Sequence, residues 1–181
     1  MIAAVLAGGR SRRMGTVKAL APLGGAPLIA RPLAAARAAG LEPVVVAKPG
    51  SPLPGALDVP VWEEPAEPVH PLCGVVCALE RAGASLLVLA CDQPWVPAEL
   101  LRTLAATDAD VALCAVEGRP QPLPARCAPA LLPQLRAALA REAPLREALT
   151  GLAPVMVAAE ARWLAGVNTP EELAAAERAL A

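Results

Sequence analysis

Short apolar runs alternate along the chain with amphipathic stretches of helical spacing. The run at 85–90 (SLLVLA) is continuous and apolar, as a strand covered on both faces requires. Similar patterns predict further strands at 2–6, 43–47, 59–62, 110–116, 121–127 and 154–159. Helices are predicted between them, at 26–40, 73–83, 97–106, 129–142, 144–150 and 169–181.

Strands and helices that alternate at this spacing are typical of βαβ units. We therefore predict an α/β fold, with a mainly parallel central sheet and helices on both of its faces. No internal repeat or linker interrupts the pattern, so residues 1–181 are expected to form one domain. Ligands of such sheets bind beyond the carboxyl ends of the strands, which directs attention to loops 7–18 and 91–97.

Two helix boundaries have local signals. The first helix is expected to carry Pro27 in its first turn and to stop at Gly40. The last is expected to use Thr169 as its N-cap and Pro170 as its first helical residue.

Composition narrows the class of protein. Hydrophobic residues make up 56% of the 181 positions, which excludes a disordered chain. The longest apolar runs, such as 85–91, are too short to cross a bilayer, so no membrane association is expected. The apolar N-terminus has its arginines after the apolar run rather than before it, unlike a signal peptide, so a cytoplasmic location is expected.

Five cysteines occur without any Cys-x-x-Cys pair, and the chain has one histidine. Cys73 and Cys77 are four positions apart, which places them on one face of the predicted helix. We expect reduced, buried thiols and no structural zinc site.

Charge is segregated along the chain. Residues 1–41 contain six basic side chains and no acid, whereas the other 140 residues carry ten basic and seventeen acidic side chains. The first segment thus holds +6 and the remainder −7, for a net charge of −1. This distribution predicts an anionic ligand near the N-terminus, and the net charge gives no indication of a nucleic-acid partner.

The stretch 6–18 (LAGGRSRRMGTVK) combines glycines with positive charge. Gly8, Gly9 and Gly15 allow backbone amides to approach an anion, and Arg13 and Lys18 supply charge for phosphates. The stretch lacks the Gly-Lys-Ser/Thr of a Walker loop and the Gly-x-Gly-x-x-Gly dinucleotide pattern. The alternative is a basic surface loop with ordinary turn glycines.

Segments 6–28, 70–75 (HPLCGV), 89–97 (LACDQPWVP), 121–125 (QPLPA) and 166–173 (GVNTPEEL) together resemble the molybdenum cofactor guanylyltransferases. The resemblance implies a three-layer α/β/α Rossmann-like nucleotidyltransferase fold. It also implies Mg²⁺-dependent transfer of GMP from GTP to Mo-molybdopterin, with attack of the pterin's terminal phosphate on the α-phosphorus and release of pyrophosphate. Molybdoenzymes or their chaperones are implied as partners.

The same resemblance assigns roles to individual residues. It implies catalytic roles for Arg13 and Lys18, as triphosphate contacts, and for Asp92, as the Mg²⁺ ligand. Asn168 matches a second metal contact. Residues implied to hold the nucleotide, in addition to Arg13, Lys18 and Asp92, are Leu6, Ala7, Gly8, Gly9, Gly74 and, more loosely aligned, Glu64. From the residues alone, Asp92 and Asn168 also suit turns before a helix.

Several positions depart from the family pattern. Val17 replaces an aspartate and His70 replaces a glycine. An asparagine is missing near position 48, where Lys48 is either a phosphate contact or a surface residue. Arg119 and Arg126 are either contacts to the pterin phosphate or surface residues.

These departures keep two rival hypotheses open. One is a related nucleotidyltransferase with another base or acceptor, such as a cytidylyltransferase, although the second glycine of LAGG is the guanine-type pattern. The other is a nucleotide-binding homologue that has lost catalysis.

Overall fold

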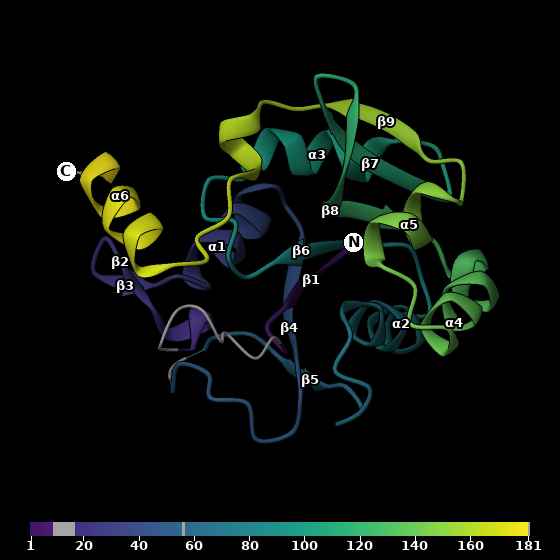
Figure 1. The fold of residues 1–181 in the computed structure, drawn as a ribbon, viewed down its shortest axis with the longest axis horizontal. Helices are drawn as coiled ribbons and strands as arrows, with labels where there is room; N and C mark the ends of the chain where they lie inside the picture. Colours follow the sequence, from purple (N-terminus) through teal and green to yellow (C-terminus); the bar gives the residue numbers. More distant parts are fainter. Residues whose placement is uncertain (9–16, 56, 181) are drawn as a thin grey trace.

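A computed structural model describes residues 1–8, 17–55 and 57–180. Within these residues a central sheet of seven strands has the order β5-β4-β1-β6-β8-β7-β9 (Figure 1). Its strands are β1 (Ile2–Leu6), β4 (Glu42–Ala47), β5 (Val61–Glu63), β6 (Leu86–Ala90), β7 (Val111–Val116), β8 (Arg119–Cys127) and β9 (Val155–Ala158).

The sheet is mainly parallel, as the sequence predicts. Strands β5, β4, β1 and β6 run in one direction, and β9 runs parallel to β7. Only β8, among the strands of the described sheet, is antiparallel to its neighbours β6 and β7. The carboxyl ends of β1, β4, β5 and β6 therefore meet at one edge, where a ligand of such a sheet is expected.

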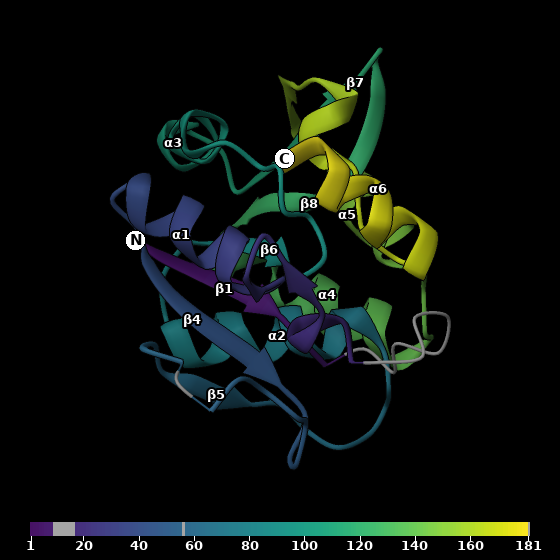
Figure 2. The same ribbon diagram turned by 90° about the vertical axis from the view of Figure 1, so that its left-hand side faces the viewer.

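Helices cover both faces of the sheet, which confirms the three-layer α/β/α expectation. Helices α2 (Pro71–Ala82), α4 (Leu132–Ala140) and α5 (Leu145–Thr150) pack on one face. Helices α1 (Ala30–Ala38) and α3 (Ala98–Ala106) pack on the other (Figures 1 and 2). In β6, Leu86 and Val88 point to the first face, and Leu87 and Leu89 to the second. All four are at most 1% exposed, which is why this strand reads as continuously apolar.

The helix expected at 26–40 is wrong in its first four residues. Ala26–Pro27 is strand β3, which pairs with β2 (Pro22–Leu23) in a hairpin, and α1 begins at Ala30. The two connecting residues, Gly24 and Gly25, have φ of 61° and 76°. A two-residue hairpin turn requires such positive φ values, and glycine adopts them without strain. Three short 3₁₀ helices were not predicted as such: η1 (Lys18–Leu20), η2 (Pro129–Leu131) and η3 (Ala161–Leu164).

A third, smaller apolar cluster joins this hairpin to the last helix, α6 (Pro170–Leu180). Its buried members are Ala21, Leu23, Leu28, Val167 and Ala176. The backbone N–H of Gly24 also donates to Glu177 Oε1 at 2.8 Å. The predicted cap of α6 is present, because the N–H of Glu172 donates to Thr169 Oγ1 at 3.2 Å.

All five cysteines are free thiols, and Cys73, Cys114 and Cys127 are buried as expected, whereas Cys77 and Cys91 are partly exposed. Burial raises the pKa of Cys91, Cys114 and Cys127 to about 12, so these thiols are poor nucleophiles and poor metal ligands near neutral pH. Among the helices of the described residues, none has the length and apolar character needed to cross a membrane.

Candidate active site

A cavity of about 450 Å³ opens at the carboxyl edge of the sheet. It is bordered by the ends of β1 and β6, by the residues that follow β4 and β5, and by the start of α2. The residues that line it are Leu6, Ala7, Gly8, Lys18, Ala19, Lys48, Glu64, Val69, His70, Pro71, Gly74, Ala90, Cys91, Asp92, Leu123 and Asn168.

Backbone hydrogen bonds continue past the strand ends and hold this edge together. The N–H of Cys91 donates to Leu6 O at 3.2 Å, and the N–H of Ala7 donates to Val46 O at 2.8 Å. The N–H of Glu64 donates to Ala47 O at 2.9 Å. The segments that follow four neighbouring strands are thus fixed side by side, although they are far apart in the sequence.

Three polar side chains meet at one end of the cavity. The ammonium of Lys18 donates to Asp92 Oδ2 at 2.8 Å and to Asn168 Oδ1 at 2.5 Å. Lys18 begins η1, Asp92 follows β6, and Asn168 precedes α6. The Lys18 and Asp92 side chains are 22% and 21% exposed, so the ion pair is partly shielded from water. We call these residues the Lys18–Asp92–Asn168 cluster.

Asn168 is placed by bonds on both of its sides. The N–H of Val167 donates to Asp92 O at 2.8 Å, which brings the two segments into contact. A Cβ on Gly166 would lie 2.9 Å from Asn168 Nδ2, so the segment needs glycine there. The backbone N–H of Asn168 donates to Glu172 Oε2 at 2.6 Å. Together with the Thr169 cap, this fixes the start of α6 beside Asp92.

Val17, which replaces an aspartate of the family pattern, lies in an apolar setting. Its half-buried side chain packs against the cluster between the sheet and helices α1 and α3. Its carbonyl accepts a hydrogen bond from the N–H of Leu20 at 2.9 Å, which closes η1. Lys18 is therefore positioned by apolar packing of the preceding residue, and its carboxylate partner is Asp92.

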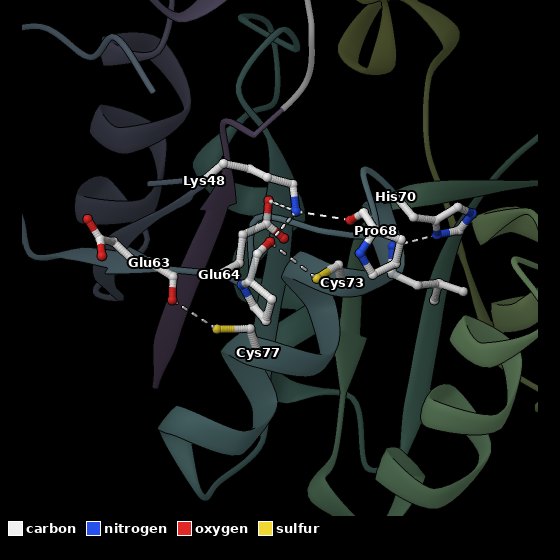
Figure 3. A network of polar contacts seen from close by, with 9 residues as sticks. Lys48, Glu63, Glu64, Pro68, His70, Cys73 and Cys77 are labelled. Atoms are coloured by element: carbon white, nitrogen blue, oxygen red, sulfur yellow. Dashed lines mark hydrogen bonds and ion pairs between the residues drawn. The ribbon is translucent and has the colours of Figure 1, made fainter. Parts of the chain in front are cut away.

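A second polar group lies at the other end of the cavity, around Glu64 (Figure 3). Glu64 is 5% exposed, and its Oε1 lies 3.6 Å from the ammonium of Lys48. Burial raises the pKa of the Glu64 carboxyl, and the charge of Lys48 opposes this rise. Cys73 and Cys77, on one face of α2, turn toward the same segment, with their thiols near Pro65 O at 3.9 Å and Glu63 O at 3.5 Å.

His70, which stands where the family pattern has glycine, is the N-cap residue that precedes α2. Its Nδ1 accepts a hydrogen bond from the N–H of Leu72 at 3.2 Å, so the imidazole caps the helix. Its φ of −141° is ordinary extended backbone, and the position makes no demand for glycine. The cavity thus has a side chain at 70 without backbone strain.

The structure brings most of the sequence-predicted site residues to one cavity. Leu6, Ala7, Gly8, Lys18, Glu64, Gly74, Asp92 and Asn168 all line it. Gly9 and Arg13 lie outside the described residues. Arg126 donates to Ala109 O and Ala105 O, at 2.8 and 3.4 Å, and pairs with Leu87 near the amino end of β6, which argues against a contact with the pterin phosphate.

Sequence reasoning was least successful with Lys48. Its side chain is 12% exposed, so the surface alternative is wrong. One signal was available, because Lys48 directly follows β4 at the ligand edge of the sheet. Val69 and Leu123 also line the cavity, and no polar pattern in the sequence marked them.

Residues 3–157 match the family model described as the MobA-like NTP transferase domain. The chain belongs to the MobA-like NTP transferase family. The match spans the strands that form the ligand edge, and it includes Lys18, Glu64, Gly74 and Asp92, which the structure gathers around the cavity.

Named relatives match the chain over different shares of its length. A molybdenum cofactor guanylyltransferase of Rhodobacter capsulatus is 38% identical over 180 residues, which cover 96% of this chain and 93% of that protein. A probable molybdenum cofactor guanylyltransferase of Carboxydothermus hydrogenoformans is 37% identical over 123 residues, or 66% of this chain and 61% of that protein.

The fold is also that of a solved family member. The crystal structure of molybdopterin-guanine dinucleotide biosynthesis protein A from Archaeoglobus fulgidus superposes with a TM-score of 0.80 at 25% identity. The superposition covers 99% of this chain and 98% of that one. The likeness to this structure thus extends over nearly the whole fold.

Nucleotidyltransferases typically use a divalent metal, and the residues present fit one. Asp92 Oδ2 and Asn168 Oδ1 converge on a single cation, the Lys18 ammonium, which shows that both oxygens can face one positive charge. No group of three or more His, Cys, Asp or Glu suited to a metal occurs among the described residues. A site with few protein ligands suits a divalent ion that takes further oxygens from phosphates and water.

Proposed function

We propose that this protein transfers GMP from GTP to Mo-molybdopterin and releases pyrophosphate. The observation that carries the proposal is the Lys18–Asp92–Asn168 cluster at the carboxyl edge of a nucleotidyltransferase sheet. It supplies a phosphate-binding cation beside two oxygen ligands for a metal. The guanylyltransferase of Rhodobacter capsulatus, which matches nearly the whole chain, supports the choice of substrates.

In this proposal, different parts of the nucleotide contact different residues along the sheet edge. The backbone of Leu6–Gly8 contacts the base and ribose, and Gly74 leaves room for them because a Cβ there would lie 3.0 Å from Leu6 Cδ2. Gly9 is assigned to the base and ribose with Leu6–Gly8, and Lys18 contacts the phosphates together with Arg13. Glu64 contacts the base.

Asp92 and Asn168 would hold Mg²⁺, which supplies positive charge to the phosphates when it is bound. Lys18 leaves its contacts with Asp92 and Asn168 and turns to the phosphate oxygens. The protein forms no covalent bond to the substrate. Its contribution is to hold the terminal phosphate of the pterin in line with the α-phosphorus of GTP and to neutralise charge on the leaving pyrophosphate.

Pyrophosphate release with molybdopterin and each of the four nucleoside triphosphates tests the proposal. We expect release with GTP and at most weak release with the other three. Release with CTP alone would identify a cytidylyltransferase. Binding of GTP in a calorimeter without any release would identify a homologue that has lost catalysis.

Asp92→Ala tests the role of the carboxylate, and the exposed Asp108→Ala is its matched control. We expect Asp92→Ala to lower turnover by at least about a hundredfold, the loss typical of removing one group that stabilises the transition state. Binding of metal-free GTP should persist. Asp108→Ala should behave as the unchanged protein, and normal turnover in Asp92→Ala would contradict the assignment.

The remaining parts of the proposal follow from the family. Residues 1–181 are taken to act as one nucleotidyltransferase domain in the cytoplasm. Molybdoenzymes or their chaperones are the proposed recipients of the product.

A further inference from the structure

Lys48 is held by protein acceptors on the segment that follows β5. Its ammonium donates to Pro65 O at 2.5 Å and to Pro68 O at 3.0 Å, and it forms an ion pair with Glu64 Oε1 at 3.6 Å. An ammonium has three N–H donors, and the two carbonyls use two of them. Both hydrogen bonds and the ion pair join Lys48 to this segment, which fixes the ammonium beside Glu64 (Figure 3).

The contacts of Lys48 place its ammonium beside the carboxylate of Glu64. Its Oε1 faces Lys48, whereas its buried Oε2 has no nitrogen or oxygen donor as a partner among the described residues, and the weakly donating thiol of Cys73 is the other polar group beside the carboxylate. Two glycines pack closely against the carboxylate, and Gly8 leaves no room for a side chain there. A Cβ on Gly74 would lie 3.1 Å from Oε2, and a Cβ on Gly8 would collide with Oε1. Buried polar atoms are nearly always satisfied, so the free oxygen marks a place for a ligand donor.

Lys48 also influences the charge of the Glu64 carboxyl. Burial favours the neutral form of the Glu64 carboxyl and raises its pKa, and the Lys48 charge acts in the opposite direction. A charged carboxylate is an acceptor only, whereas a protonated one carries a donor in its place. Without Lys48, burial would act on Glu64 unopposed by the nearest cation.

The place of Glu64 in the sheet indicates which part of a nucleotide it meets. Glu64 follows β5 and Asp92 follows β6, and β4 and β1 lie between these strands. With strands about 4.8 Å apart, the two residues are separated by roughly 14 Å along the edge. Phosphates held at Lys18 and Asp92 therefore leave the base end of the nucleotide near Glu64.

We propose that Lys48 is a positioning residue for base selection: it holds Glu64 as a charged acceptor whose free oxygen receives the adjacent N1–H and N2–H donors of guanine. The inference rests on the proposed function, since it assumes that GTP is the nucleotide. Cytosine and adenine lack this pair of adjacent donors on their pairing edges, so they gain less from the same carboxylate.

Calorimetric binding of GTP and of inosine triphosphate, which lacks only the 2-amino group, measures this selection. The unchanged protein should bind GTP about tenfold more tightly, which is typical of one hydrogen bond to a charged group. Lys48→Met should reduce the ratio to less than about threefold, and Lys48→Arg should restore part of it. Arg102→Met removes a surface cation that also donates to a backbone carbonyl, and it should leave the ratio unchanged.

Glu64→Gln is the second variant, because it keeps the shape of the side chain and removes its charge. It should lower the ratio of the affinities for GTP and inosine triphosphate, as Lys48→Met does. The double variant should show no greater loss of this preference than either single variant. The ratio of GTP to 2′-deoxy-GTP should stay constant throughout, and a change in that ratio would instead assign Glu64 to the ribose.

Besides a changed preference for GTP over 2′-deoxy-GTP, two outcomes would overturn the inference. One is an unchanged GTP-to-inosine ratio in Lys48→Met. The other is a loss of affinity in Lys48→Met that is large for GTP but absent for GMP, because this result would make Lys48 a phosphate contact. Failure of the proposed function gives a different result, in which the unchanged protein does not prefer GTP over CTP.

Discussion

Lys18 occupies, in this structure, the position between the two oxygens proposed to hold a metal. Its ammonium lies 2.8 Å from Asp92 Oδ2 and 2.5 Å from Asn168 Oδ1. A metal that binds these oxygens without nucleotide must first displace it. Lys18→Met, which keeps the length of the side chain and removes its charge, should therefore strengthen metal binding to the nucleotide-free protein.

The structure sets the size of this effect. Unit charges about 4 Å apart near a protein surface attract by about 4 kcal/mol at an effective dielectric constant near 20. Both side chains keep about a fifth of their exposure, so solvent and side-chain ordering cancel much of this attraction. A net value of about 1–2 kcal/mol remains, which corresponds to roughly tenfold tighter metal binding in Lys18→Met.

Titration with Mn²⁺, followed by the loss of the free-ion electron paramagnetic resonance signal, measures this affinity directly. Arg102→Met is the control, because it removes one positive charge far from the cluster and reports the effect of net charge alone. Asp92→Asn should weaken Mn²⁺ binding. If Lys18→Met binds Mn²⁺ no more tightly than Arg102→Met, Lys18 does not compete with the metal and the reasoning fails.

Three further predictions concern stability and binding. Val17→Asp should lower the free energy of unfolding by about 1–2 kcal/mol in urea titrations, because it places a carboxylate in a half-buried apolar position; unchanged stability would contradict the packing role. Gly74→Ala should leave the melting temperature nearly unchanged but weaken GTP binding, since its Cβ would lie 3.1 Å from Glu64 Oε2; normal GTP affinity would argue against a nucleotide there. Because the folded state raises the pKa of Glu64, it holds this proton to higher pH than the unfolded chain does, so the free energy of unfolding should fall as pH rises from about 4.5 through the raised pKa. Glu64→Gln should remove that part of the pH profile, and an identical profile would show that Glu64 does not contribute.

The sheet was predictable because its strands carry strong local signals. Strand β6 is buried on both faces, and its continuous apolar run has few other interpretations. The hairpin at 22–27 was missed because its strands have two residues each, and they blend into the apolar start of α1. Its only local signal is the pair Gly24–Gly25, which is also consistent with an ordinary loop.

The members of the cavity were predictable, but their partners were not. Motifs assigned Lys18, Asp92 and Asn168 to one site, yet the bonds between them join residues 74 and 150 positions apart. Spacing along the chain carries no information about such contacts. Lys48 was misjudged for the same reason, since its acceptors are backbone carbonyls of Pro65 and Pro68, and carbonyls leave no mark on a sequence.

The apolar contacts between the β2–β3 hairpin and α6 affect the geometry of the Lys18–Asp92–Asn168 cluster, and therefore its affinity for a metal. The hairpin follows η1, which begins with Lys18, and α6 follows Asn168, so the other two members of the Lys18–Asp92–Asn168 cluster are both attached to one small substructure (Figure 1). A repacking substitution there, such as Leu28→Val, would shift both side chains relative to Asp92 together. Metal affinity could then evolve independently of base selection, through residues that touch neither ligand.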